Sequence, residues 1–389
     1  MNGITPKLNR LRSTGLVFGI LGLALCGVGY VFDREPFFVS WLFAFLFWMS
    51  LSLGCLYCGM IHYLTSGKWG FSARRILEAG YMTLPLMALL IIPVFFGLHE
   101  LYPWARPETV LTDKILRQRA TYANPPLFII RAVVFFGIWI FIACALRRWS
   151  LRQDTTNDPA PTIRMRTLSG PAVGIAPLIA SFAFLDWAMT IEPDWSSTIF
   201  PVIQLAGQIL IAITFVIILL AWTRNDAPFS DFPEKPFHDL GSLLLAFVLF
   251  WTYVAFSQVL LIYSANLPHE ITWYLHRIAG GWIWIVGLIG LFHFFTPFLL
   301  LLFRAIKQNI RALAVIAFLV FAMHAIEMFW VIAPAFYRHI EIHWTDFAAW
   351  FGIGGIWLAV FAANLDRHPL LARNDPRTEP LITETAHAK

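Results

Sequence analysis

Two ionisable side chains lie one helical turn apart inside a long apolar stretch of this chain. His324 and Glu327 have the spacing i, i+3, which places both on one face of a helix. His293 lies within the preceding apolar stretch. Because burying ionisable groups in such helices is costly, the pattern favours a proton-handling or ligand-facing role. The alternatives are a buried structural hydrogen bond for the pair and a core histidine bonded to a backbone carbonyl for His293.

A dense group of carboxylates and indoles forms the second candidate site. It comprises Asp186, Trp187, Glu192, Asp194 and Trp195, with no basic residue between them. The acidity suits docking of a basic partner or collection of protons, and Asp186 is a further proton-transfer candidate. The alternative is a structural loop, in which Asp186 is only an interfacial residue.

Other polar residues in apolar stretches add few candidates. Ser257 and Gln258 reach a depth similar to that of Asp186 and join the proton-transfer candidates. Cys55 and Cys58 form a C-x-x-C, a spacing that can hold a metal or do redox chemistry. Because no second cysteine pair or nearby histidine completes such a site, we predict no metal and interpret both cysteines as small packing residues.

The composition places these residues in a membrane. Of 389 residues, 59% are hydrophobic and 13% charged, and the mean hydropathy is +0.68. Soluble domains carry roughly 25% charged residues, so this chain has too little polar surface for a water-soluble fold. The net charge of +5 comes from bases in short loops, a pattern typical of membrane orientation and not of nucleic-acid binding.

Ten apolar runs are long enough to cross a bilayer as helices, which takes about 20 residues each. Continuous apolarity excludes the alternating strands of a membrane barrel. We therefore predict an all-α, polytopic membrane protein, a single domain with a polar tail over 366–389. The helices are expected near 14–32, 38–64, 77–98, 127–146, 171–191, 199–222, 239–265, 280–303, 310–333 and 347–365.

Basic residues predict the orientation of these helices. An even number of helices puts both termini on one side, and that side carries 20 of the 28 lysines and arginines, against 8 on the other. The positive-inside rule then makes both termini cytoplasmic.

Glycine pairs suggest where helices approach closely. Gly15 and Gly19, like Gly170 and Gly174, are spaced i, i+4, and Gly280 precedes Gly281 directly. Small residues at such spacings let helix backbones come together in a membrane.

Several mixed-polarity motifs resemble the F subunit of alternative complex III, the bacterial quinol:electron-acceptor oxidoreductase. The matching stretches cover most of the chain between the fifth and ninth predicted helices. They are Leu185–Thr198, Phe237–Gly241, Phe250–Gln258, Asn266–Tyr274 and His324–Trp330.

The resemblance implies two four-helix bundles with flanking helices, as in the membrane subunits of the polysulfide reductase group. It implies a location in the bacterial inner membrane beside a related quinol-binding membrane subunit, an iron–sulfur subunit and haem c subunits. No cofactor is expected on this chain itself, although quinol or menaquinol is a candidate ligand. Asp186, His293, His324, Glu327, Ser257 and Gln258 then become proton-transfer or quinol-facing candidates, and direct quinol binding and proton conduction both stay open.

Two other functions compete with this reading. A haem b anchor would need histidine pairs on facing helices, which His293 and His324 could supply. A secondary transporter would need matching broken helices at the midplane. Pro85 and Pro93 interrupt the third predicted helix, but no corresponding pair stands in the other half.

The orientation can be tested at the acidic segment. A cysteine introduced at Ser196 should react with a membrane-impermeant thiol reagent added outside intact spheroplasts, because the basic residues place this loop outside. Labelling that occurs only after permeabilisation would reverse the predicted topology.

Overall fold

The computed structural model describes residues 4–226, 235–372 and 374–375, which form helices and connecting segments without a strand among them. Ten helical segments in this part of the chain are long and apolar enough to span a membrane. The predicted all-α, polytopic membrane architecture is thereby confirmed.

The spanning segments follow one another along the chain. The first five are α1 (Thr5–Phe32), α2 (Arg34–Thr65), the interrupted α3–α4–α5 (Lys68–Tyr81, Leu84–Leu90, Ile92–Phe96), α9 (Pro125–Gln153) and α10 (Ala160–Trp187). The last five are α11 (Phe200–Thr223), α12 (Lys235–Ala265), α14–η4–α15 (Trp282–Leu288, Ile289–Phe295, Thr296–Leu301), α17 (Ile310–Ile332) and α18 (Trp344–Asp366).

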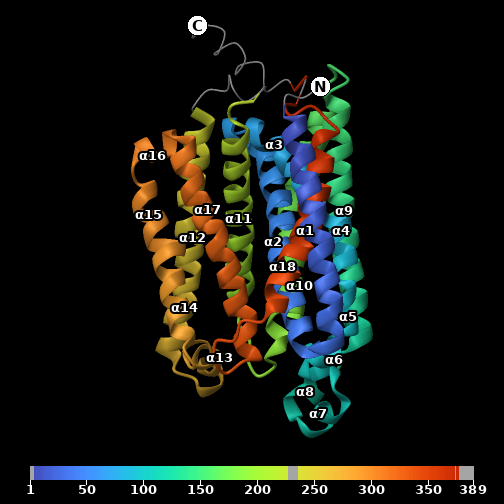
Figure 1. Cartoon of the computed structure of the whole chain (residues 1–389), viewed down its shortest axis with the longest axis vertical. Helices are drawn as coiled ribbons and strands as arrows, with labels where there is room; N and C mark the ends of the chain where they lie inside the picture. The colour runs from blue at the N-terminus through green and yellow to red at the C-terminus, as the bar shows by residue number, and fades with distance from the viewer. Residues whose placement is uncertain (1–3, 227–234, 373, 376–389) are drawn as a thin grey trace.

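Short helices connect them. On the side where α1 ends, α6 (Leu98–Leu101), α7 (Pro107–Thr112) and α8 (Lys114–Arg119) make a projection, and α13 (Pro268–Ile278) lies nearby (Figure 1). On the opposite side, α16 (Arg304–Gln308) joins α15 to α17. The termini of the membrane domain share that side, because Thr5 donates a hydrogen bond of 3.0 Å to Asp366.

The third spanning segment departs from its predicted range of 77–98. It begins at Lys68, so Arg74 and Arg75 belong to a buried helix and not to a loop. Proline explains its interruptions: Pro85 and Pro93 occupy the second positions of α4 and α5. Proline has no backbone N–H group and is tolerated in the first turn of a helix, whereas in the helix interior it would break the hydrogen-bond pattern.

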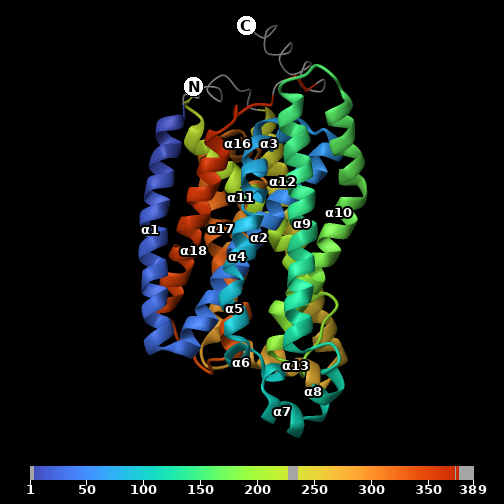
Figure 2. The same cartoon turned by 90° about the vertical axis from the view of Figure 1, so that its right-hand side faces the viewer.

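The helix α2 lies at the centre of the protein, and its apolar part is entirely buried. It forms one group of four with α3–α4, α9 and α10, and it also packs against α11 of a second group that comprises α11, α12, α14–α15 and α17 (Figures 1 and 2). The helices α1 and α18 lie side by side outside these two bundles. The arrangement agrees with two four-helix bundles and flanking helices.

Glycine accounts for the close approach of α1 and α18. A Cβ atom on Gly22 would lie 2.5 Å from the Gly352 Cα atom, and one on Gly355 would lie 2.4 Å from the Gly19 backbone nitrogen. Since such distances exclude any side chain, the backbones themselves form this interface. The packing role predicted for Gly15 and Gly19 is confirmed, because a Cβ on Gly15 would meet the Gly355 carbonyl oxygen at 2.7 Å.

The other glycine predictions need correction. Cβ atoms on Gly170 and Gly174 would meet no atom within 4 Å, so this pair faces open space instead of a helix. Gly280 and Gly281 adopt φ values of +57° and +93°. They form the turn before α14, a conformation that glycine adopts without strain.

A cluster of charges closes the end of the first bundle nearest Thr5. Fully buried Glu78 accepts hydrogen bonds from Arg74 Nε at 3.0 Å and from the Arg75 and Arg147 guanidinium groups at 2.5 Å each. Tyr63 donates another at 2.9 Å, and the Ser150 hydroxyl is also bound. One carboxylate thus joins α2, α3 and α9.

Two further carboxylates neutralise this cluster. Asp375 pairs with Arg74 at 2.6 Å, and Asp154 pairs with Arg75. Three arginines therefore meet three carboxylates. Asp375 of the predicted tail over 366–389 is thereby held against α3, and residues 373 and 376–389 lie outside the described residues.

The charge cluster predicts a strong dependence of stability on Glu78. Glu78→Gln keeps the size of the side chain but leaves three buried guanidinium groups with two carboxylates. Removing one partner of a buried ion pair costs roughly 3–5 kcal/mol of unfolding free energy. The purified variant should therefore unfold at a clearly lower temperature than the wild type. The folded fraction that remains after heating is measured by size-exclusion chromatography.

Glu108→Gln is the matched control, because Glu108 pairs only with exposed His99. That substitution should change stability by less than about 0.5 kcal/mol. Equal melting of the two variants would refute a stabilising role for Glu78.

Candidate functional site

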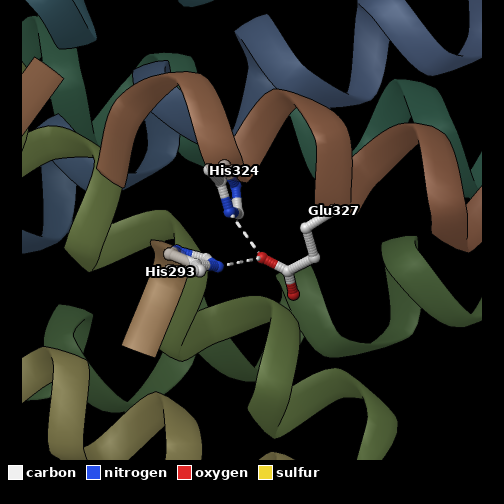
Figure 3. Close-up of side chains that lie close together, drawn as sticks. All are labelled: His293, His324 and Glu327. Atoms are coloured by element: carbon white, nitrogen blue, oxygen red, sulfur yellow. Dashed lines mark hydrogen bonds and ion pairs between the residues drawn. The ribbon is translucent and has the colours of Figure 1, made fainter. Parts of the chain in front are cut away.

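Three of the predicted residues converge in the interior of the second bundle. The Glu327 Oε2 atom lies 2.9 Å from His324 Nδ1 and 3.5 Å from His293 Nδ1 (Figure 3). All three residues are at least 96% buried. A single carboxylate oxygen is therefore placed between two imidazole rings, away from water and lipid.

The local helix geometry explains this convergence. His324 and Glu327 are one turn apart on α17, as their spacing predicted. His293 lies in the π-helical stretch η4, which ends two residues before Pro297. In a regular α-helix the Pro297 ring would clash with the carbonyl group of His293, four residues earlier. The wider turn relieves that clash, and π-helical turns of this kind occur frequently at functional sites.

Trp251 and Gly207 complete the surroundings of the cluster. Trp251 on α12 donates its indole N–H to Glu327 Oε1 at 2.9 Å, and its ring lies 4.4 Å from that of His293. A Cβ atom on Gly207 of α11 would lie 2.6 Å from His324 Cε1. Trp251 thus leaves Oε2 for the histidines, and Gly207 makes room for the His324 ring.

A cavity of about 210 Å³ adjoins the cluster, and Glu327 and Trp251 form part of its wall. The remaining lining is mostly apolar and includes several aromatic rings, with Gln204, Thr252, Gln258 and Tyr274 as further polar residues. Glu327 is therefore the acidic group that a molecule in this cavity would meet.

The cluster has donors for either a proton or a metal. Ligand atoms of His293, His324 and Glu327 all lie within 4.8 Å of one another. However, metal-bound histidines normally donate their second ring N–H to a partner, and Nε2 of both rings lacks a hydrogen-bond partner among the described residues. The 2.9 Å contact between Glu327 and His324 is a hydrogen-bond distance. Proton sharing therefore fits this geometry best, and the absence of a metal stays a prediction.

The two rings do not face one another as haem ligands would. Their centroids are 6.0 Å apart with planes at 59°, and the Glu327 carboxylate lies against both Nδ1 atoms (Figure 3). A haem iron would have to occupy the place of that carboxylate. This arrangement does not favour the haem b alternative.

Asp186 belongs to a different place in the protein. Its Oδ2 atom accepts a hydrogen bond of 2.6 Å from Arg131 of α9, and Arg131 also donates to the Tyr122 carbonyl. Burial and the nearby Asp186 raise the pKa of Tyr122 to about 12. Figure 2 shows α10 and α17 on either side of α2, so the structure does not bring Asp186 to Glu327.

Glu192 and Trp195 contact α13, which forms part of the cavity wall. Glu192 pairs with Arg277 at 2.6 Å and with His276 at 3.0 Å. Trp195 stacks on Trp273 with 4.5 Å between centroids, and the Arg277 guanidinium lies 3.7 Å from the Trp273 centroid. Burial lowers the pKa of Arg277, which Glu192 opposes. This contact network fixes α13, whose Trp273 and Tyr274 line the cavity.

The remaining sequence candidates line the cavity, are held by contacts within the protein, or are exposed. Gln258 is buried and lines the cavity, whereas the Ser257 hydroxyl is bound to the Tyr253 carbonyl at 2.7 Å. Trp187 is buried beside Phe136, and Asp194 is exposed. Of the five candidates in the acidic segment, Asp194 is the one left accessible to a partner.

Two residues of the site escaped the sequence reasoning. Trp251 precedes Gln258 by seven residues and so shares its helix face, a spacing that could have identified it. No comparable signal marks Gly207, because its role depends on a ring from another helix.

Comparisons with known proteins add no relative to this description. No protein-family model matches the chain, and no curated protein shows significant similarity to it.

Proposed function

We propose that this chain is a membrane subunit of a respiratory quinol:electron-acceptor oxidoreductase of the alternative complex III type, in which it accepts or conducts protons released from quinol. The proposal starts from the five sequence motifs that resemble the F subunit of that complex. The site itself supports it through one observation: a buried carboxylate, shared by two histidines, forms part of a cavity wall.

Quinol oxidation needs a group that accepts protons, and Glu327 in the cavity wall can supply one. Each quinol releases two protons as it loses two electrons, so a base must lie near the ring. Glu327 can take one proton at Oε2 and exchange it with Nδ1 of His324 or His293. Histidine is suited to this relay because its charge changes near neutral pH.

The dimensions of the cavity define what it can hold. At about 210 Å³ it is smaller than the roughly 300–1,000 Å³ of sites for drug-sized ligands. A single substituted ring fits this space, whereas an isoprenoid tail would extend into the bilayer. Aromatic walls would hold the ring by stacking, and Gln258 and Tyr274 offer hydrogen-bonding groups for its oxygens.

Glu327→Gln tests the proton relay directly. The amide keeps the size of the side chain and can still bind the Trp251 N–H, but it cannot take up a proton. The complex should assemble normally, and its rate of quinol oxidation should fall by roughly 10²-fold or more for a lost general base. If Glu327 only conducts protons, fewer protons per electron should instead appear on the releasing side of the membrane. Both are measured in proteoliposomes with a pH-sensitive dye.

Glu327→Leu provides the structural comparison, because it also leaves Trp251 without an acceptor. If Glu327 only stabilises the bundle, Gln should be almost silent and Leu should impair assembly. Unchanged turnover and proton stoichiometry in the assembled Gln variant would remove Glu327 from the mechanism.

Assembly tests the identity of the complex. The described part of the chain offers no extramembrane domain that could hold a redox centre, so electron transfer would need partner subunits. An affinity-tagged chain purified from its native membrane should carry haem c, seen as visible absorbance, and iron–sulfur subunits. Recovery of a stable, solitary protein that is active in solute uptake would favour a transporter instead.

A further inference from the structure

A long apolar crevice separates α17 from α18 on the side of the protein away from the Glu327 cavity. It consists of two cavities of about 320 and 300 Å³ that share Trp350 and Phe351 of α18. Phe318 and Phe321 of α17 line one part, and Ala325 and Phe329 line the other. The helices α1, α18 and α17 follow one another across this side in Figure 2.

The crevice is deep and nearly without polar groups. It reaches Trp48 of the central helix α2 and Phe215 of α11. Asp346 at its far end is already bound by the Ser40 hydroxyl at 2.6 Å and the His343 N–H at 2.8 Å. Protein interiors are close-packed, so a space that opens toward the bilayer between spanning helices should contain an apolar chain.

Its length suits the apolar chain of a lipid. The lining residues of α17 run from Phe318 to Phe329, which is ~16 Å at helical rise. An extended acyl chain can lie along a crevice of this length, with its headgroup at one end.

Helical spacing places two arginines on crevice-facing sides of α1 and α17, toward the end of the protein that contains Thr5. Arg311 precedes Phe318 by seven residues on α17 and so shares its crevice-facing side. Arg10 precedes Thr14, a lining residue of α1, by one turn on the same face. Both arginines are exposed, and neither has an acidic partner among the described residues.

We propose that this crevice binds an anionic phospholipid from the leaflet on the Thr5 side of the membrane. Its acyl chain would fill the space between α17 and α18, and its phosphate would pair with Arg10 and Arg311. This site is independent of the function proposed for the Glu327 cluster.

The test uses the purified full-length chain in detergent, titrated with phosphatidylglycerol or with zwitterionic phosphatidylcholine of the same acyl composition. Binding is followed by the rise in melting temperature and by native mass spectrometry. An arginine near an anionic lipid contributes ~1 kcal/mol. Arg10→Gln and Arg311→Gln should therefore each weaken phosphatidylglycerol binding about fivefold, and the double variant about 25-fold.

Arg12→Gln is the matched control, since it removes the same charge from the same turn but from another face of α1. It should bind phosphatidylglycerol as the wild type does. Thr14→Phe, which narrows the mouth, should weaken binding of both lipids, whereas Val17→Phe on the exposed side of α1 should not.

Three results would overturn the proposal. Equal stabilisation of the wild type by both lipids would show that the anionic headgroup is not recognised. If Arg12→Gln weakened phosphatidylglycerol binding as much as Arg10→Gln and Arg311→Gln do, the attraction would come from the overall positive charge and not from this site. If neither lipid stabilised the protein and none were retained, the crevice would not be a lipid site, and a protein partner would be the remaining occupant.

Discussion

A bilayer cannot solvate charge, and this constraint determines how the interior of the protein is built. The buried carboxylates of the spanning helices have specific partners: Glu78 meets three arginines, Asp186 meets Arg131, and Glu327 meets two histidines. Asp346 accepts hydrogen bonds from the Ser40 hydroxyl and the His343 N–H. The contacts of Glu78, Asp186 and Glu327 join spanning helices that follow one another along the chain: α3 to α9, α9 to α10, and η4 to α17. The positions of α3, α9, α10, η4 and α17 therefore follow from charge pairing as well as from apolar packing.

The two deepest clusters solve the same problem with different chemistry. Around Glu78, three arginines and three carboxylates balance, and arginine does not release its proton in proteins. That cluster is suited to holding helices together. Around Glu327, the partners are imidazoles, which exchange protons near neutral pH, and a cavity adjoins the carboxylate. The difference in partner, and not in burial, makes Glu327 the group on which we base the proposed function.

Sequence patterns predicted the elements better than their contacts. Ten continuous apolar runs were enough to define the spanning helices, and the i, i+3 spacing placed His324 beside Glu327. Glu78 was missed because the arginines before it resemble a polar loop until the fold pairs Arg74 with Asp375 and Glu78 with Arg147. The acidic outer segment read as a docking surface because the partner of Glu192, Arg277, lies 85 residues away. Likewise, the π-helical turn that carries His293 depends on a local backbone clash that hydropathy does not report.

The central claim is that Glu327 exchanges a proton with a molecule in the adjoining cavity. Redox-difference infrared spectroscopy of the assembled complex, recorded as quinol is added, tests it most directly. The account predicts a carboxyl C=O band that changes with quinol oxidation in the wild type and is absent from the Glu327→Gln spectrum. Identical difference spectra for the two proteins would show that the protonation of Glu327 does not change, and would contradict the account.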